Sequence, residues 1–378
     1  MTDVLVHADS MRSPELRHEV PLSVPDPFLY VEHGGEKHAV VVSFEIDRID
    51  ALGIDVATHP LEEFGYDDLL AEGKSRDEVA REIALRACRR IGVERAAVPP
   101  TFPLELADYL RSQGIELEPD RTLFDTRRRV KNEFELAGIR RAQRGCEAAM
   151  AAACRVLRGA EVSDATLTIE GEQLTCERLK LVVEQIFGQH GLSAEEFVVS
   201  HGPQTAIGHE MGSGPIAPNE PIVFDLFPRD RESGCYADMT RTFVVGEPTE
   251  ELARYQLLCR EALDRALEAI RPGVAGREVH RLVCDFFHEH GFPTQLSKQP
   301  GEVLRDGFYH GLGHGVGLEV HEKPALGRGP DELVAGDVVA VEPGLYRQGF
   351  GGCRLEDLVL VTEAGAENLT DYPYQLEP

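Results

Sequence analysis

The stretch DLFPRDRESGCYADMTRTF, Asp225–Phe243, decides how the C-terminal part of this chain folds. It starts inside the apolar run PIVFDLF, which is typical of a buried strand, and Asp238 opens a second strand-like run thirteen residues after Asp225. The Pro-, Gly- and Asp-rich segment between the two aspartates fits a hairpin loop. The sequence therefore predicts two adjacent antiparallel strands, each carrying an aspartate.

Both aspartates need a partner, because burying an unpaired carboxylate costs several kcal/mol. In one interpretation, Asp225 stands at a strand end and caps the following turn. In the other, the hairpin brings Asp238 opposite Asp225 across the strand pair. Two facing buried carboxylates repel each other unless a cation lies between them, so this second interpretation predicts a metal site.

Three downstream motifs add polar side chains in apolar surroundings. YHGLGHGVGLEVHE carries His310, His314 and His321, VVAVEPGLY carries Glu342, and CRLEDLVLVT carries Glu356. Each residue alone fits a surface carboxylate or a hydrogen-bonded imidazole. Together with the two aspartates they supply four carboxylates and an imidazole, a set suited to Mn²⁺, Co²⁺, Fe²⁺ or Zn²⁺ and able to bridge two ions.

These motifs resemble those of the pita-bread metallopeptidase family, which includes methionine aminopeptidase, aminopeptidase P and prolidase (Xaa-Pro dipeptidase). The resemblance covers roughly residues 130–362. It implies a C-terminal pita-bread fold with two metal ions. It further implies that Asp225 holds one ion through both oxygens, that Asp238 and Glu356 bridge both ions, and that His314 and Glu342 complete the other.

The resemblance also implies catalytic and substrate-binding residues. GPQTAIGH aligns His209 with the substrate-side histidine of the family, and His310 and His321 match the flanking histidines of its proline-specific branch. These histidines would bind the scissile carbonyl and stabilise the tetrahedral intermediate, and Glu342 is the candidate general base. Arg354 is a candidate for binding a substrate carboxylate, with a structural ion pair as the alternative.

Two features depart from the family pattern. The segment between Asp225 and Asp238 is two residues longer than usual, and Gly208 replaces the proline that usually precedes the substrate-side histidine. Because the longer loop is a hairpin insertion that leaves both strand ends in place, we expect metal binding to be retained.

The first third of the chain alternates strand-like and helix-like stretches. FLYVE, HAVVVSFEID and AAVPP are typical of strands, and SRDEVAREIALRACRRIG has apolar residues at helical spacing. A long helical stretch over 130–160, closed by Gly159, follows. We therefore predict an α+β protein with a smaller N-terminal α/β creatinase-like domain, 1–125, and a pita-bread catalytic domain, 126–378. In similar family members the small domain borders the active-site cleft, often that of a partner subunit, so a homodimer is expected.

The composition excludes several classes of function. The 378 residues include 66 acidic and 39 basic ones, and the net charge of −27 would repel nucleic acid and anionic membrane surfaces. The sequence has neither a signal-peptide pattern at its start nor an apolar run of membrane-spanning length, which favours a cytoplasmic location. The eight cysteines are dispersed without a C-x-x-C pair, so buried free thiols are expected.

The family resemblance implies an enzyme that hydrolyses Xaa-Pro bonds of small peptides by attack of a metal-bridging water, with Mn²⁺ as the expected ion. It would act as a dipeptidase or as an aminopeptidase P-like enzyme, and the chain length favours the dipeptidase-like branch. One alternative is a non-peptidase hydrolase or lyase on the same fold, similar to ectoine hydrolase or dimethylsulfoniopropionate lyase. A metal-free creatinase type and an inactive binding module similar to those of histone chaperones are less favoured, because all five ligand positions are occupied by ligand residues.

Overall fold

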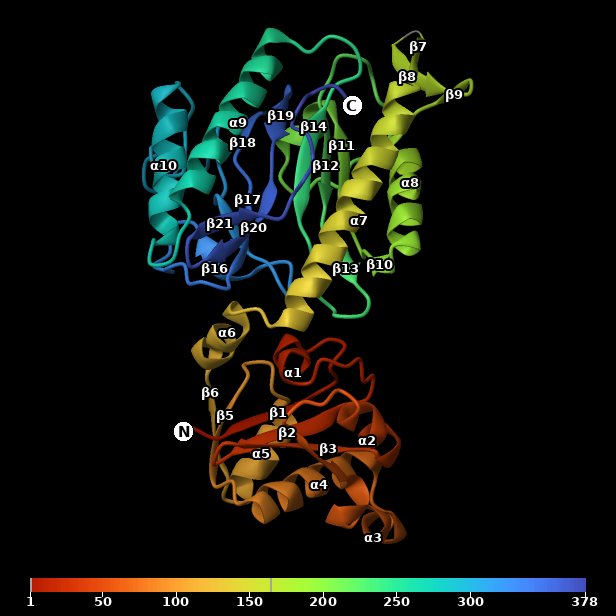
Figure 1. The fold of residues 1–378 in the computed structure, drawn as a ribbon, viewed down its shortest axis with the longest axis vertical. Coiled ribbons are helices and arrows are strands. Elements are labelled where there is room, and N and C mark those ends of the chain that lie inside the picture. Colours follow the sequence, from red (N-terminus) through yellow and green to blue (C-terminus); the bar gives the residue numbers. More distant parts are fainter. Residues whose placement is uncertain (1, 164) are drawn as a thin grey trace. The chain divides into compact units, whose positions relative to one another are not determined.

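The computed structural model describes residues 2–163 and 165–378. The chain divides into two compact units, Met1–Arg128 and Arg129–Pro378 (Figure 1). We propose that these units are the two domains expected from the sequence. The boundary expected after Asp125 lies within helix α6 (Arg121–Arg129).

The N-terminal unit contains a six-stranded mixed sheet in the order β4-β3-β2-β1-β5-β6. Strand β2 runs antiparallel to both of its neighbours, and the other pairs are parallel. The strands are β1 (Val4–Ala8), β2 (Phe28–His33), β3 (Glu36–Val41), β4 (Ala57–Pro60), β5 (Arg95–Val98) and β6 (Glu116–Pro119).

Helices cover this sheet, and the predicted helix over SRDEVAREIALRACRRIG is confirmed as α4. It begins after Ser75, whose side chain forms a capping box with Glu78. The prediction that HAVVVSFEID is one strand is wrong in its second half. The strand ends at Val41 and helix α2 follows, because Glu45 and Ile49 are buried at helical spacing. The helices are α1 (Pro14–Glu19), α2 (Ser43–Asp50), η1 (Leu61–Phe64), α3 (Tyr66–Ala71), α4 (Arg76–Ile91) and α5 (Leu104–Ser112).

The C-terminal unit is built on several small antiparallel sheets. The two that matter for the site have the orders β11-β12-β14 and β16-β15-β17-β20-β21. Their strands are β11 (Val198–His201), β12 (Ile222–Leu226), β14 (Met239–Phe243), β15 (Gly313–Gly315), β16 (Glu322–Leu326), β17 (Val338–Val341), β20 (Asp357–Thr362) and β21 (Gly365–Asn368). The shorter pairings use β7 (Glu161–Ser163), β8 (Thr166–Ile169), β9 (Glu172–Gln173), β10 (Leu192–Ser193), β13 (Arg229–Asp230), β18 (Gly344–Arg347) and β19 (Gly351–Arg354), with the 3-10 helix η2 (Gly202–Ala206) after β11.

Two helix pairs flank these strands (Figure 1). Helices α7 (Glu133–Arg158) and α8 (Cys176–Gln189) share an apolar core with β11, β12 and β14. Helices α9 (Glu250–Ala269) and α10 (Gly276–Glu289) share a second core with β17, β19 and β20. The predicted long helix is confirmed as α7, which begins after Asn132 in a capping box with Glu135. The strands that carry the site thus pack against two apolar cores.

The predicted hairpin is confirmed. Strands β12 and β14 are antiparallel, with Asp225 opposite Thr240 and Leu226 opposite Met239. The expected pairing of Asp238 directly opposite Asp225 is wrong, because this register places Asp238 two residues away, diagonal to Asp225. The connection is more than a simple loop, since the short strand β13 within it pairs with β10.

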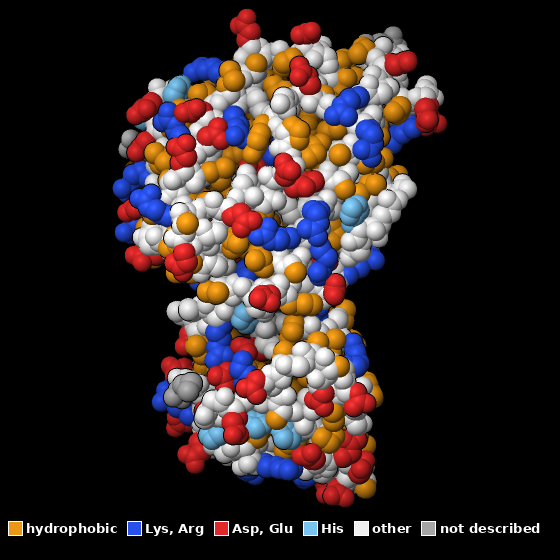
Figure 2. All heavy atoms as spheres, in the orientation of Figure 1, with side chains coloured by type: hydrophobic (Ala, Val, Ile, Leu, Met, Phe, Trp, Pro, Cys, Tyr) orange, Lys and Arg blue, Asp and Glu red, His pale blue; other side chains and the backbone are white. Residues whose placement is uncertain are grey.

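The rest of the structure agrees with the composition. Acidic, basic and hydrophobic side chains are interspersed on the face drawn in Figure 2. All eight cysteines are buried and unpaired, as expected. Within 2–163 and 165–378, no helix combines the length and the apolar character needed to cross a membrane.

Candidate active site

One cavity of about 440 Å³ in the C-terminal unit brings together every site residue predicted from the sequence. These residues come from the two antiparallel sheets, from strand β19 and from the adjoining loops. They are Asp225, Asp238, His314, Glu342, Glu356, His209, His310, His321 and Arg354.

Among the residues of the cavity, Asp238 most strongly indicates a cation site. It stands directly before β14 and its residue surface is 3% exposed. Its Oδ1 atom is buried and has no hydrogen-bond partner in the described structure. A buried carboxylate oxygen without a partner is costly, so a cation fits this position.

His314 is held with one nitrogen turned toward the carboxylates. Its Nδ1–H donates to the carbonyl of Gly315 at 3.2 Å, which leaves the lone pair on Nε2. This Nε2 lies 3.7 Å from Oδ2 of Asp238 and 3.8 Å from Oε1 of Glu342. These distances are too long for hydrogen bonds. They are close to the roughly 3 to 3.5 Å that separates neighbouring ligand atoms around an ion with bonds of about 2.1 Å.

Glycines allow His314 to occupy this place in the sheet. A Cβ atom on Gly313 would lie 1.9 Å from the carbonyl oxygen of Ala340, and one on Gly315 would lie 2.3 Å from that of Lys323. Side chains at these two positions would therefore push β15 away from β17 and β16. The glycine-rich motif keeps the histidine strand close between its neighbours.

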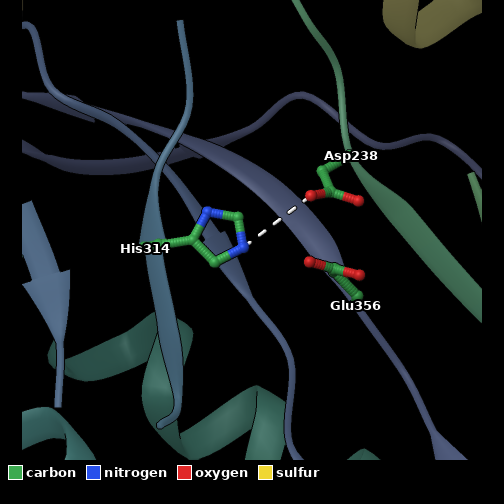
Figure 3. Close-up of side chains that lie close together, drawn as sticks. All are labelled: Asp238, His314 and Glu356. Carbon is green, nitrogen blue, oxygen red and sulfur yellow. Dashed lines mark ion pairs between the residues drawn. The ribbon is translucent and has the colours of Figure 1, made fainter. Parts of the chain in front are cut away.

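Asp238, His314 and Glu356 point toward one another from three different segments (Figure 3). One possible ligand atom from each lies within 4.8 Å of the others. Glu356 is 2% exposed and its Oε2 accepts a hydrogen bond from Oγ1 of Thr240 at 2.6 Å. This trio could hold a metal ion.

The charges of the site are unbalanced without a cation. Burial, with repulsion from the neighbouring carboxylates, raises the pKa of Asp238 and of Glu356 well above the usual range. Burial also raises the pKa of Glu342 to about 8, opposed by Arg354 and reinforced by Asp225. The pKa of His314 is lowered to about 4, chiefly by burial, so its imidazole is neutral. Four carboxylates facing one guanidinium and a neutral imidazole fit divalent cations.

Arg354 forms a structural ion pair in this site. Its Nη2 donates to Oδ2 of Asp225 at 2.6 Å, its Nε to Oγ1 of Thr240 at 3.2 Å, and its Nη1 to the hydroxyl of Tyr346 at 3.1 Å. The residue is 5% exposed. Because each of its three nitrogens is engaged, the placement favours the structural alternative over binding of a substrate carboxylate.

His310 is held by the same network. Its Nδ1–H donates to the carbonyl of Gly311 at 2.7 Å, so Nε2 is the acceptor of the Tyr346 hydroxyl, 2.9 Å away. Nδ1 also lies 3.7 Å from Oε2 of Glu342. Burial lowers the pKa of His310 to about 3. Arg354, Tyr346 and His310 therefore form a continuous hydrogen-bonded wall.

The other two predicted histidines differ from His310 in exposure. His209 and His321 are exposed and line the cavity. The His321 ring packs edge-on against that of His314 with centroids 4.2 Å apart. Both imidazoles can be reached by a molecule that enters the cavity.

Three further residues that were not predicted from the sequence position this site. Thr240 contacts Glu356, Tyr346 contacts Arg354 and His310, and Arg241 contacts the backbone of Glu356. Arg241 is fully buried, donates to the carbonyl of Glu356 at 2.8 Å and pairs with Asp357 at 2.8 Å. A signal was present, because an arginine within the buried strand MTRTF needs several acceptors.

Comparison with known proteins agrees with this geometry. Residues 137–363 match the model of metallopeptidase family M24. The Xaa-Pro dipeptidase of Pyrococcus furiosus is 34% identical over 192 residues, 50% of this chain and 51% of the relative. That of Pyrococcus horikoshii is 30% identical over 302 residues, 79% of this chain and 77% of the relative. With the first of these, the chain thus aligns over only about half of the relative's length.

Among solved structures, an X-Pro aminopeptidase from Thermotoga maritima superposes with a TM-score of 0.78 at 21% identity. The superposition covers 98% of this chain and 96% of that one. At this identity the likeness establishes the fold. The prediction of an α+β protein with a pita-bread unit and an N-terminal creatinase-like unit is confirmed.

Proposed function

Because this chain belongs to metallopeptidase family M24, we propose that it hydrolyses Xaa-Pro bonds of small peptides with the help of two divalent metal ions. One observation carries the proposal: four carboxylates and the Nε2 of His314 converge on one cavity, where a buried oxygen of Asp238 has no partner. Asp225, Asp238, His314, Glu342 and Glu356 are the proposed ligands.

Two such ions, when bound, polarise a peptide carbonyl and lower the pKa of an attacking water. We assign the accompanying proton transfer to Glu342. A carboxylate oxygen of Glu342 takes the proton of the water and later gives it to the leaving nitrogen of proline. Nδ1 of His310 lies 3.7 Å from this carboxylate, which is beyond hydrogen-bond range.

Three histidines support a preference for proline. The amide nitrogen of an Xaa-Pro bond carries no hydrogen, so the site must hold the substrate through its carbonyl oxygen, its free amine and the ring. His209 and His321 are the proposed contacts of the carbonyl and the ring. His310, which is part of the hydrogen-bonded wall with Tyr346, is proposed to stabilise the tetrahedral intermediate.

The remaining details of the proposal rest on chemistry and on the relatives. Oxygen-rich ligand sets suit Mn²⁺, which we propose as the native ion ahead of Co²⁺, Zn²⁺ and Fe²⁺. The buried free thiols suit the reducing cytosol, which we propose as the location. We further propose a homodimer, which light scattering would detect as twice the chain mass of 41.7 kDa.

A substrate panel tests the proposal. Ala-Pro, Ala-Pro-Ala, Ala-Ala and non-peptide substrates such as ectoine derivatives are incubated with enzyme loaded with Mn²⁺, Co²⁺ or Zn²⁺. The proposal predicts hydrolysis of Ala-Pro well above Ala-Ala, and the rate on Ala-Pro-Ala separates a dipeptidase from an aminopeptidase. Equal rates on Ala-Ala and Ala-Pro would contradict the proline preference, and turnover of the non-peptide substrates alone would contradict peptidase activity.

A further inference from the structure

A second hollow, of about 410 Å³, borders the active-site cavity. Phe227 and Val320 line both hollows, so the two share these side chains as a border. We refer to the second hollow as the side pocket. Its other lining residues are Ser193, Glu195, Glu196, Arg229 and Tyr236.

The unusually long loop between Asp225 and Asp238 supplies three of the seven residues that line the side pocket. Phe227, Arg229 and Tyr236 all come from this loop. Arg229 pairs with Ser193 of β10 through the backbone, and its Nε donates to the carbonyl of Gly234 at 2.9 Å. These contacts attach the loop to the scaffold and to itself.

Further bonds keep the loop rigid. The backbone N–H of Tyr236 donates to the carbonyl of Gly317 at 2.8 Å. The buried carboxylate of Asp230 accepts from Arg141 at 2.7 Å and from the Ser233 hydroxyl at 2.7 Å. The side pocket is therefore a preformed feature with fixed aromatic walls, which favours selective binding.

The side pocket carries net negative charge, which can orient a bound dipeptide. Two exposed carboxylates, those of Glu195 and Glu196, line the side pocket together with one guanidinium, that of Arg229. The guanidinium carbon of Arg229 lies 5.9 Å from the centre of the Tyr236 ring. A dipeptide is positive at its N-terminal amine and negative at its C-terminal carboxylate. Net negative charge therefore draws the N-terminal residue toward the side pocket and repels the carboxylate.

We propose that the side pocket binds the side chain of the N-terminal substrate residue and selects lysine or arginine over acidic residues. Phe227 and Tyr236 offer apolar faces for the methylene stem of such a side chain, and its charged end reaches Glu195 and Glu196. This inference rests on the proposed function, and it names the substrate class of the same site.

The test compares kcat/KM for Lys-Pro, Met-Pro and Glu-Pro in the metal-loaded enzyme. We expect Lys-Pro to exceed Glu-Pro by about tenfold or more, which corresponds to about 1.4 kcal/mol of discrimination. The double variant Glu195→Gln/Glu196→Gln should bring this ratio close to one. It should leave the metal content unchanged and lower kcat/KM for Met-Pro less than that for Lys-Pro, because Met-Pro loses only the attraction of its N-terminal amine.

A matched control separates the effect of charge in the side pocket from the effect of the protein's total charge. Glu184→Gln/Glu289→Gln removes the same charge from two exposed positions outside the side pocket and should keep the Lys-Pro preference. A wild-type enzyme that cleaves Met-Pro but treats Lys-Pro and Glu-Pro alike, or a ratio unchanged in the pocket variant, would overturn this inference and leave the proposed function standing. Failure to cleave any of the three dipeptides and also their tripeptide forms Lys-Pro-Ala, Met-Pro-Ala and Glu-Pro-Ala would overturn both.

Discussion

The Nη2 atom of Arg354 lies 2.6 Å from Oδ2 of Asp225, and the same guanidinium reaches Tyr346 and Thr240. The first proposed metal ligand is thus fixed by an ion pair that is largely buried. Arg354 supplies positive charge to a cavity of four carboxylates and orients one of them.

Arg354→Gln should therefore destabilise the protein strongly. Removing one partner of a buried ion pair typically costs about 3–5 kcal/mol in the free energy of unfolding, and we expect a loss of this order when the metal has been removed. Bound metal should recover part of it. Urea unfolding with chelator and with Mn²⁺ measures both values. Arg347→Gln is the control, because the Arg347–Glu251 pair is exposed and its loss should change the free energy of unfolding far less. Equal effects of the two variants would contradict the role given to Arg354.

Protons and metal should compete for the site. Since burial raises the pKa values of Asp238, Glu356 and Glu342 above those of unfolded chains, these groups stabilise the metal-free fold in acid. That stability should be lost as the pH rises through about 8, the pKa of Glu342. Metal affinity should increase over the same range, because binding displaces protons.

Calorimetric titration of Mn²⁺ in buffers of different ionisation enthalpy measures this proton release directly. At pH 7 we expect at least one proton to be released per chain, and fewer when Glu342 is replaced by Gln. Metal binding without proton release at pH 7 would contradict the assigned charge states.

His321→Ala should lower kcat/KM for Ala-Pro while both metal ions remain bound. The His321 ring lies beside that of the proposed ligand His314 but is itself exposed to the cavity. We expect a decrease of about 10- to 100-fold, the loss of one or two well-placed interactions of about 1.4 kcal/mol each. Metal analysis accompanies the kinetics. If the variant lost its metal, His321 would be shown to support metal binding and not substrate binding.

Glu342→Gln should separate proton transfer from metal binding. The amide keeps the shape and one oxygen but cannot accept a proton, and general-base catalysis typically contributes about 10²- to 10⁴-fold. We expect kcat to fall within that range while at least one ion remains bound. Near wild-type turnover with both ions bound would exclude Glu342 as the base.

Asp238→Asn is the comparison for that variant. Its position within reach of both His314 and Glu356 makes Asp238 the proposed bridge, so losing its charge should reduce metal occupancy and kcat together. If Asp238→Asn kept its metal, the proposed bridging role would be wrong.

Much of the site could be predicted because most of its polar residues lie in short, recognisable sequence motifs. Asp225, Asp238 and the residues of the HGLGHGVGLEVHE motif stand next to apolar strands, where a carboxylate or an imidazole requires a partner. The hairpin followed from the turn-forming residues between the aspartates, and the structure has the predicted strand pair.

Other features depend on contacts between distant segments. The sequence left the role of Arg354 open, since only the fold brings its Nη2 to Asp225, 129 positions away. The Tyr346 hydroxyl was missed because its partner His310 lies 36 positions earlier. The error at HAVVVSFEID, where the strand was predicted to continue too far, has a different cause. The β-branched residues of β3 are followed almost directly by helix α2, and no glycine or proline marks the change.

The most direct test of the account is a titration of metal-free enzyme with Mn²⁺, in which bound ions per chain and the rate of Ala-Pro hydrolysis are measured on the same samples. Four buried carboxylates facing a single guanidinium predict that the metal-free enzyme is inactive and that the rate reaches its plateau when two ions are bound per chain. Full turnover in enzyme shown by elemental analysis to be free of metal would contradict the central claim.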